Sequence, residues 1–129
     1  MMKITVEELQ AYLYEQYGLW GEETGLFMKL MEEIGEVAEV LNKRSGRKGN
    51  HGEDLKEELA SELADVIHYA VSIAAINDID LNDVILEKDK KAAIKYHHER
   101  NLEDFVISFL VDAHKNTPRS PCGERGAKN

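Results

Sequence analysis

Two short acidic motifs carry the side chains best suited to chemistry. The first places Glu33 and Glu36 three residues apart, and the second places Glu62 and Asp65 at the same spacing. On a helix, residues three apart lie within roughly 60° of each other on consecutive turns, so each pair presents two carboxylates in one direction. Four carboxylates brought together by packed helices would repel one another without a cation between them. Oxygen ligands of this kind suit a hard cation such as Mg²⁺.

The neighbouring apolar residues predict that the two pairs converge. Each acid directly precedes an apolar residue of its helix, namely Ile34, Val37, Leu63 or Val66. We therefore expect all four carboxylates to flank the apolar seams on equivalent sides, where packed helices bring them together at the margin of the core. Clustered carboxylates are costly through repulsion and desolvation unless a cation or protons compensate for them. The alternative is a solvated surface, but the repeated arrangement favours a metal site.

Two long helices are predicted to position these motifs. One is expected over residues 23–43 and another from near Asp54, separated by a polar, glycine-containing loop at 45–52. The two therefore form a hairpin. Apolar residues spaced three and four apart define the expected buried faces: Phe27, Leu30, Ile34, Val37 and Leu41 on the first, and Leu55, Leu59, Leu63, Val66, Ala70 and Ile73 on the second.

Shorter helices are predicted on either side of this hairpin. Thr5 and Glu8 form a capping-box pattern before a helix over residues 6–17. Asp80 is predicted to cap a helix over residues 81–98. The expected inward residues of the first helix are Leu9, Tyr12, Leu13 and Tyr17.

The fold class that follows is all-α, with a four-helix-bundle-like domain over residues 1–115. A short C-terminal helix is expected from a cap at Asn101 to about Leu110, although its β-branched and aromatic residues leave a strand as the alternative. Residues 116–129 contain turn formers and charges and are predicted to be a flexible tail. The hairpin of two long amphipathic helices, with a short helix on either side, leaves apolar surface that one chain does not cover. Self-association is therefore expected.

The composition limits the partners and the compartment. A net charge of −9 and a sequence pI near 5.0 argue against binding to a nucleic-acid polymer, which depends on many basic contacts to phosphates. The single cysteine, Cys122, has no partner for an internal disulfide, which fits a reducing compartment such as the cytoplasm. No signal-peptide pattern is recognisable and no stretch approaches the ~20 apolar residues of a membrane span, so no membrane is expected.

The segment KLMEEIGEVAEVLNK, followed by ELADVIHY, resembles the EExxE and ExxD motifs of MazG-like nucleotide pyrophosphohydrolases, in the all-α NTP pyrophosphatase superfamily. The resemblance covers roughly residues 5–97. It implies that Glu33, Glu36, Glu62 and Asp65 bind Mg²⁺, with Mn²⁺ as a substitute. The implied reaction is hydrolysis of a (d)NTP between its α- and β-phosphates, to a monophosphate and pyrophosphate. A homodimer or homotetramer is also implied.

Further residues are candidates for contacts with a nucleotide. By the resemblance, Lys88 lies where relatives carry a phosphate-facing lysine, and Lys91 follows one turn later. Ala92 stands where relatives commonly have an asparagine, which is a departure from the family pattern. Tyr69 resembles a residue that lines the base pocket in relatives, and Trp20 is the other stacking candidate.

The acids also suggest how water could be activated. A carboxylate-bound Mg²⁺ would neutralise the substrate's phosphates and lower the pKa of the attacking water. Either Glu32 or Glu36 could accept the water's proton, and the sequence does not choose between them.

Two other classes of protein fit parts of the pattern. Asp65 and His68 form half of a di-iron motif, but ferritin-like di-iron proteins need Glu-x-x-His on two helices, and a packed histidine is the simpler interpretation. A non-catalytic helical interaction protein, with its acids acting only as solubilising groups, is the second alternative.

Overall fold

The computed structural model describes residues 1–46 and 55–115, and these residues form helices and no strand. They divide into two compact units, Met1–Asp83 and a second that starts at Val84. This confirms the all-α prediction. The predicted tail and most of the predicted loop at 45–52 lie outside the described residues. The five helices are α1 (Val6–Tyr17), α2 (Glu23–Arg44), α3 (Lys56–Ile76), α4 (Leu81–Lys95) and α5 (Leu102–Lys115).

The predicted N-terminal caps are present. The Thr5 hydroxyl accepts from the Glu8 backbone N–H at 3.0 Å, and the Glu8 carboxylate accepts from the Thr5 backbone N–H at 2.9 Å, which completes the capping box. Asp80 and Asn101 each accept from the backbone N–H three residues further on, at 3.2 and 2.9 Å. These side chains satisfy N–H groups that a helix start leaves without a partner.

Two helix ends differ from the prediction. Helix α4 stops at Lys95 because His97 adopts a left-handed conformation with φ of 57°, and the His98 N–H turns back to the Ala93 carbonyl at 2.9 Å. This closure satisfies carbonyls at the helix end. Helix α5 is longer than expected, since it continues to Lys115, and it is a helix, not the alternative strand.

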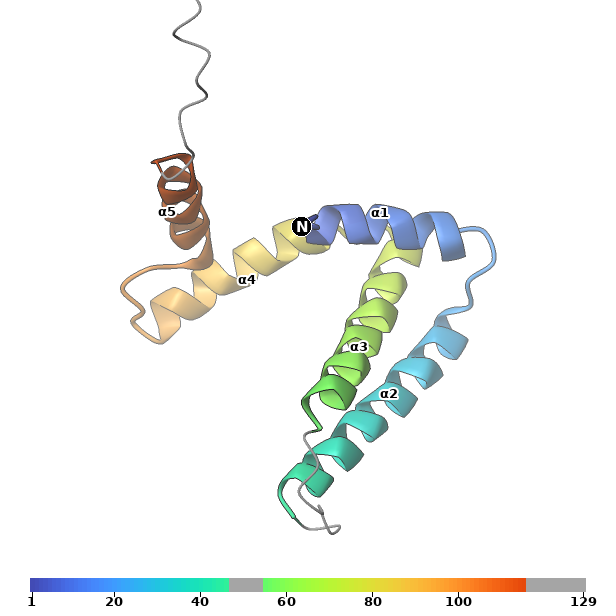
Figure 1. Cartoon of the computed structure of the whole chain (residues 1–129). Coiled ribbons are helices and arrows are strands. Elements are labelled where there is room, and N and C mark those ends of the chain that lie inside the picture. Colours follow the sequence, from blue (N-terminus) through green and yellow to red (C-terminus); the bar gives the residue numbers. More distant parts are fainter. Residues whose placement is uncertain (47–54, 116–129) are drawn as a thin grey trace, which may run out of the picture. The chain divides into compact units, whose positions relative to one another are not determined.

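The core of the first unit lies where α1 crosses α3. Leu13 is fully buried against Val71 and Ala75, with Leu9 and Tyr17 packed around them. Figure 1 shows α3 in contact with α1 at one end and alongside α2 for most of its length. The predicted inward residues of α1 are therefore confirmed, except that Tyr12 is 55% exposed.

The contact between α2 and α3 is rotated from the predicted seam. Leu26 and Val40 are the buried residues of α2, whereas the predicted seam residues Phe27, Ile34 and Leu41 are 44–49% exposed. Apolar residues cover a wide arc of α2, so their spacing alone does not define which part of that arc contacts α3. The predicted seam is thus partly an unpartnered surface.

The exposed apolar residues of α2 and α3 lie on one face of the hairpin. Phe27 directly follows the buried Leu26, and Leu63 directly follows Glu62, so each is turned about 100° from the interhelix contact in the same sense. The two helices run antiparallel (Figure 1), and equal rotations then point toward the same side of the pair. We call this side the apolar face, which consists of Phe27, Met31, Ile34, Leu41, Leu63 and Ile67.

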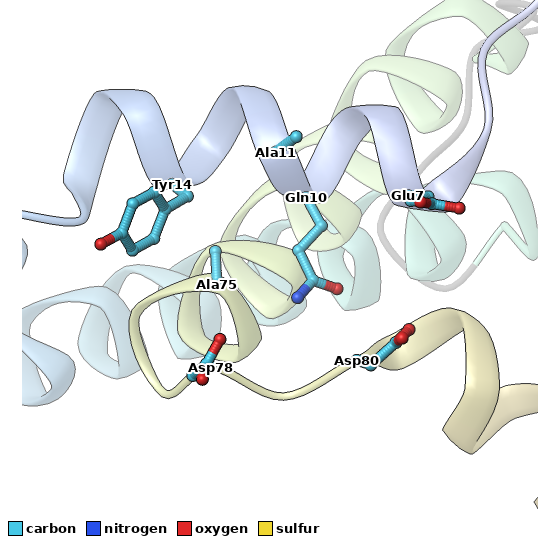
Figure 2. A pocket seen from close by; sticks show the side chains of 7 residues that line it. All are labelled: Glu7, Gln10, Ala11, Tyr14, Ala75, Asp78 and Asp80. Carbon is cyan, nitrogen blue, oxygen red and sulfur yellow. The ribbon is translucent and has the colours of Figure 1, made fainter.

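The turn after α3 is held by one side chain of α1. The Gln10 amide donates to the Ile79 carbonyl, and its Oε1 accepts from the Leu81 backbone N–H at 3.2 Å. Figure 2 shows Gln10 reaching across an open pocket toward this turn, with Asp78 and Asp80 on the far side. Asp78 has a left-handed φ of 54° and closes the end of α3 as His97 closes α4.

The second unit joins α4 to α5 by polar contacts. Lys90 pairs with Glu103 at 2.9 Å, and Asp89 accepts from the Leu102 backbone N–H at 2.6 Å. Helix α5 itself has no buried residue. Its exposed large apolar side chains are Phe105, Val106, Ile107, Phe109, Leu110 and Val111.

Helix α3 bears on the prediction that no membrane is involved. It is long and apolar enough, by length and composition alone, to cross a membrane. This is weak evidence, because a core helix of a soluble protein passes the same test. Glu62 and Asp65 lie in the middle of α3, and carboxylates are costly at that depth of a bilayer. The apolar character of α3 fits its contacts with α1 and α2 better.

Candidate metal centre

The acidic residues lie closer to the α2–α3 contact than the sequence predicts. Glu33 is seven residues from both Leu26 and Val40, and residues seven apart on a helix lie along the same side. Glu33 therefore occupies a position between two buried apolar residues instead of flanking the seam. Glu62 faces it from α3, and both are half-buried.

Three of the four predicted ligands form a compact group. One carboxylate oxygen from each of Glu33, Glu62 and Asp65 lies within 4.8 Å of the other two. The Glu36 carboxyl is within hydrogen-bonding range of Glu33 and of Glu62, so the fourth predicted residue adjoins the group. We call these four residues the acidic cluster. Both helices of the hairpin contribute two members.

The electrostatics of the acidic cluster are unfavourable as it stands. Glu33 Oε2 and Glu62 Oε2 are shielded from solvent, and neither has a hydrogen-bond partner among the described residues. Burial raises the pKa of Glu33. The contact with Glu36, together with burial, raises the pKa of Glu62 to about 7. The neighbouring carboxylates disfavour the ionised forms of Glu33 and Glu62 because like charges repel.

A divalent cation fits this arrangement. Oxygens that bind one Mg²⁺ at about 2.1 Å lie at most about 4.2 Å apart, so small side-chain rotations suffice to bring the grouped oxygens onto one ion. The two shielded oxygens would gain the positive partner that they lack. Two members of the acidic cluster lie on one outer side of the hairpin. Glu36 follows Glu33 by three residues and Asp65 follows Glu62 by three, which places them opposite to the apolar face.

The predicted base Glu32 lies beside the cluster and is paired. Its carboxylate contacts the Lys29 ammonium at 3.3 Å, and both side chains are 55% exposed. Hydrogen bonding to Glu32 raises the pKa of Lys29, with a further contribution from Glu33. Sequence reasoning did not select Lys29. The signal was available, since Lys29 lies one turn before Glu33 and hence on the same side of α2.

The two predicted stacking residues share a pocket. Trp20 and Tyr69 line an open pocket of about 370 Å³ together with Tyr17 and Lys29. We call it the aromatic pocket. The Tyr17 and Trp20 ring centroids are 5.6 Å apart. Helix α3 contributes Tyr69, one turn after Asp65, so the pocket and the acidic cluster are neighbours along the hairpin.

His68 supports this pocket as a packed histidine. Its Nε2 lies 2.9 Å from the Tyr17 hydroxyl, and its ring contacts Tyr69 edge to face at 4.9 Å. Burial raises the pKa of Tyr17, so the phenol stays protonated and able to donate. A histidine engaged with a tyrosine is a poor match for the di-iron alternative, in which it would bind metal.

The predicted phosphate contacts Lys88 and Lys91 lie on α4, in the second unit, and both are exposed. Their role stays a prediction. Ala92, the departure from the family pattern, is half-buried beside them.

Comparison with known proteins tests the resemblance to MazG-like nucleotide pyrophosphohydrolases. A search of curated proteins found no match, and neither did a search of solved structures. The family model described as the MazG nucleotide pyrophosphohydrolase domain matches residues 22–99. The match includes both acidic motifs and covers more than half of the 129 residues. The chain therefore belongs to the MazG nucleotide pyrophosphohydrolase family.

Proposed function

We propose that the protein is a Mg²⁺-dependent nucleoside triphosphate pyrophosphohydrolase, with Mn²⁺ as a substitute ion. It cleaves a canonical or modified (d)NTP between the α- and β-phosphates to the monophosphate and pyrophosphate, and so limits the nucleotide pool in the cytoplasm. Membership of the family implies a nucleotide pyrophosphatase. The observation that carries the finer proposal is the grouping of Glu33, Glu62 and Asp65 from two helices, with oxygens that lack partners among the described residues.

Each residue of the acidic cluster has a role in this proposal. Glu33, Glu36, Glu62 and Asp65 would hold the cation. The cation, when bound, neutralises the phosphates and lowers the pKa of water. Glu36 and Glu32 are the candidate bases. Of the two, Glu32 is the one that contacts the Lys29 ammonium, at 3.3 Å.

A pyrophosphate-release assay tests the activity. With Mg²⁺ and a panel of canonical and modified NTPs and dNTPs, we expect release of pyrophosphate and a monophosphate from at least one nucleotide. Glu36→Gln and Asp65→Asn should each lower turnover at least about 100-fold, because each removes a charged ligand from the ion. Circular dichroism should show unchanged helix content.

Glu15→Gln is the matched control, since Glu15 is an exposed acid of α1 outside the cluster. It should leave turnover unchanged. Wild-type protein that is folded and loaded with Mg²⁺ but inactive on the whole panel would favour the non-catalytic interaction protein instead. Full activity of both cluster variants would refute the assignment of the cluster.

We also propose that the domain, residues 1–115, works as a homodimer or homotetramer. The apolar face presents half-exposed large side chains from both helices, on the side opposite to Glu36 and Asp65. A second hairpin packed there would complete a four-helix bundle without covering the acidic cluster.

Ile67→Gln is expected to shift the protein toward monomer, since Ile67 is 54% exposed on the apolar face. Light scattering after size-exclusion chromatography measures the mass. Leu19→Gln is the control, because Leu19 is 96% exposed but lies in the α1–α2 connection. A monomeric wild type would contradict this assignment of the interface, and so would an Ile67→Gln variant whose assembly has the same mass as that of the wild type.

A further inference from the structure

The aromatic pocket contains a cation at the end that adjoins the acidic cluster. Lys29 is the one basic residue among its described lining residues, which otherwise include Tyr17, Trp20 and Tyr69. The Lys29 ammonium is close enough to Glu33 for the two charges to interact. The pocket thus has an aromatic part suited to a planar ring and a positive group near the metal-binding acids.

The antiparallel hairpin explains this placement. On α2 the step from Glu33 to Lys29 runs one turn toward the N-terminus, and on α3 the step from Asp65 to Tyr69 runs one turn toward the C-terminus. Because the helices run in opposite directions, both steps lead toward the end of the hairpin at which α3 contacts α1 (Figure 1). A molecule that leaves the acidic cluster in this direction meets Lys29 and Tyr69 together.

The pair between Lys29 and Glu32 contributes little to folding. Both side chains are 55% exposed and lie three residues apart on one helix, and such pairs contribute little to stability. An anion can therefore replace Glu32 as the partner of Lys29 at small cost. A phosphate is a stronger partner, since it carries more charge and several acceptor oxygens.

We propose that Lys29 is a phosphate-binding residue of the substrate site, which contacts the phosphate attached to the nucleoside while Trp20 and Tyr69 border the nucleoside itself. Before the ligand binds, Glu32 holds the ammonium beside the pocket. This inference rests on the proposed function, because it assumes that the ligand is a nucleotide. Lys29, Trp20 and Tyr69 all belong to the first unit, so the inference does not depend on Lys88 or Lys91.

The fluorescence of Trp20 provides a direct test, since it is the only tryptophan of the chain and lines the pocket. The wild type is titrated, in Mg²⁺, with each of the four deoxynucleoside monophosphates and with the matching deoxynucleosides. Lys29→Gln should weaken binding of the monophosphate about tenfold or more and leave nucleoside binding unchanged, because only the charged contact is lost. Lys29→Arg should restore most of the affinity.

Lys3→Gln is the control for a general change in charge, since Lys3 is an exposed lysine that precedes α1. It should bind every ligand as the wild type does. A monophosphate affinity that is equal in Lys29→Gln and the wild type would overturn the role of Lys29 and leave the proposed function standing. A wild type that binds no nucleotide, by fluorescence and by calorimetry, would overturn both.

Discussion

Replacing Glu62 with glutamine is expected to stabilise the metal-free protein and to abolish its response to Mg²⁺. The contact with Glu36, together with burial, raises the pKa of Glu62 to about 7. At pH 8 Glu62 of the wild type is therefore mostly ionised and is repelled by the carboxylates of Glu36 and Glu33. A neutral amide removes this repulsion and can donate hydrogen bonds to the neighbouring carboxylates. Thermal unfolding at pH 8 in EDTA should show a melting temperature that is higher by roughly a few degrees.

Added Mg²⁺ should stabilise the wild type but not the Glu62→Gln variant. It should stabilise the wild type by about 2.7 kcal/mol at one hundred times the dissociation constant, because only the folded state offers the assembled site. It should have little effect on Glu62→Gln. Glu57→Gln, an exposed acid in the first turn of the same helix, is the control and should behave as the wild type does. If Glu62→Gln is less stable than the wild type without metal, the charge of Glu62 in the wild type does not destabilise the folded protein.

The affinity for the cation should depend steeply on pH below about 7. The ion binds the ionised carboxylates, and Glu62 has a pKa of about 7, so binding must displace a proton at lower pH. Each pH unit below this value should therefore weaken binding by up to about tenfold, with a plateau above pH 8. Calorimetric titrations with Mn²⁺ in buffers of different ionisation enthalpy would count the protons released.

Stability without metal should have the reverse dependence on pH. The folded-state pKa of Glu62 lies above its ordinary value of 4.5, so the folded protein binds more protons than the unfolded chain between these values. The free energy of unfolding contributed by this group should therefore fall as pH rises from about 4.5 to about 7 and then stay level. Glu62→Gln should lack this part of the profile. Equal pH profiles for both proteins, with and without metal, would contradict the account of the cluster.

Much of the fold could be predicted from local signals. The capping box at Thr5 and the caps at Asp80 and Asn101 fix where helices start, because each uses only neighbouring residues. The end of α4 could not be predicted in this way, since the left-handed conformation of His97 is not the glycine signal that usually marks a helix end. The length of α5 was underestimated because its β-branched and aromatic residues have only modest helix propensity.

The residues of the candidate site could be predicted from the sequence, but their position within the contact between α2 and α3 could not. The spacing of the acids indicated that they face one way, and the structure brings Glu33, Glu62 and Asp65 together. The spacing of the acids does not show that Glu33 lies within the α2–α3 contact. A wide apolar arc such as that of α2 fits several orientations of the helix about its own axis. Lys29 was missed for a related reason, since an isolated lysine on a helix has no pattern until Trp20 and Tyr69 are placed beside it.

The exposed apolar residues connect these two results. Because the side of α2 that carries Glu33 faces α3, Phe27, Ile34 and Leu41 are left at 44–49% exposure. The orientation of α2 that assembles the acidic cluster therefore also leaves the apolar face exposed. The proposed self-association and the proposed metal site are two consequences of one helix orientation.

The central claim is that acids from two helices share one divalent ion. Electron paramagnetic resonance of free Mn²⁺, titrated with the protein at pH 8, tests it most directly because it measures binding without any assumption about substrate. We expect saturable loss of the free Mn²⁺ signal with the wild type, and much weaker binding with either Glu33→Gln on α2 or Asp65→Asn on α3. Binding by both variants with the affinity of the wild type would contradict a shared ion.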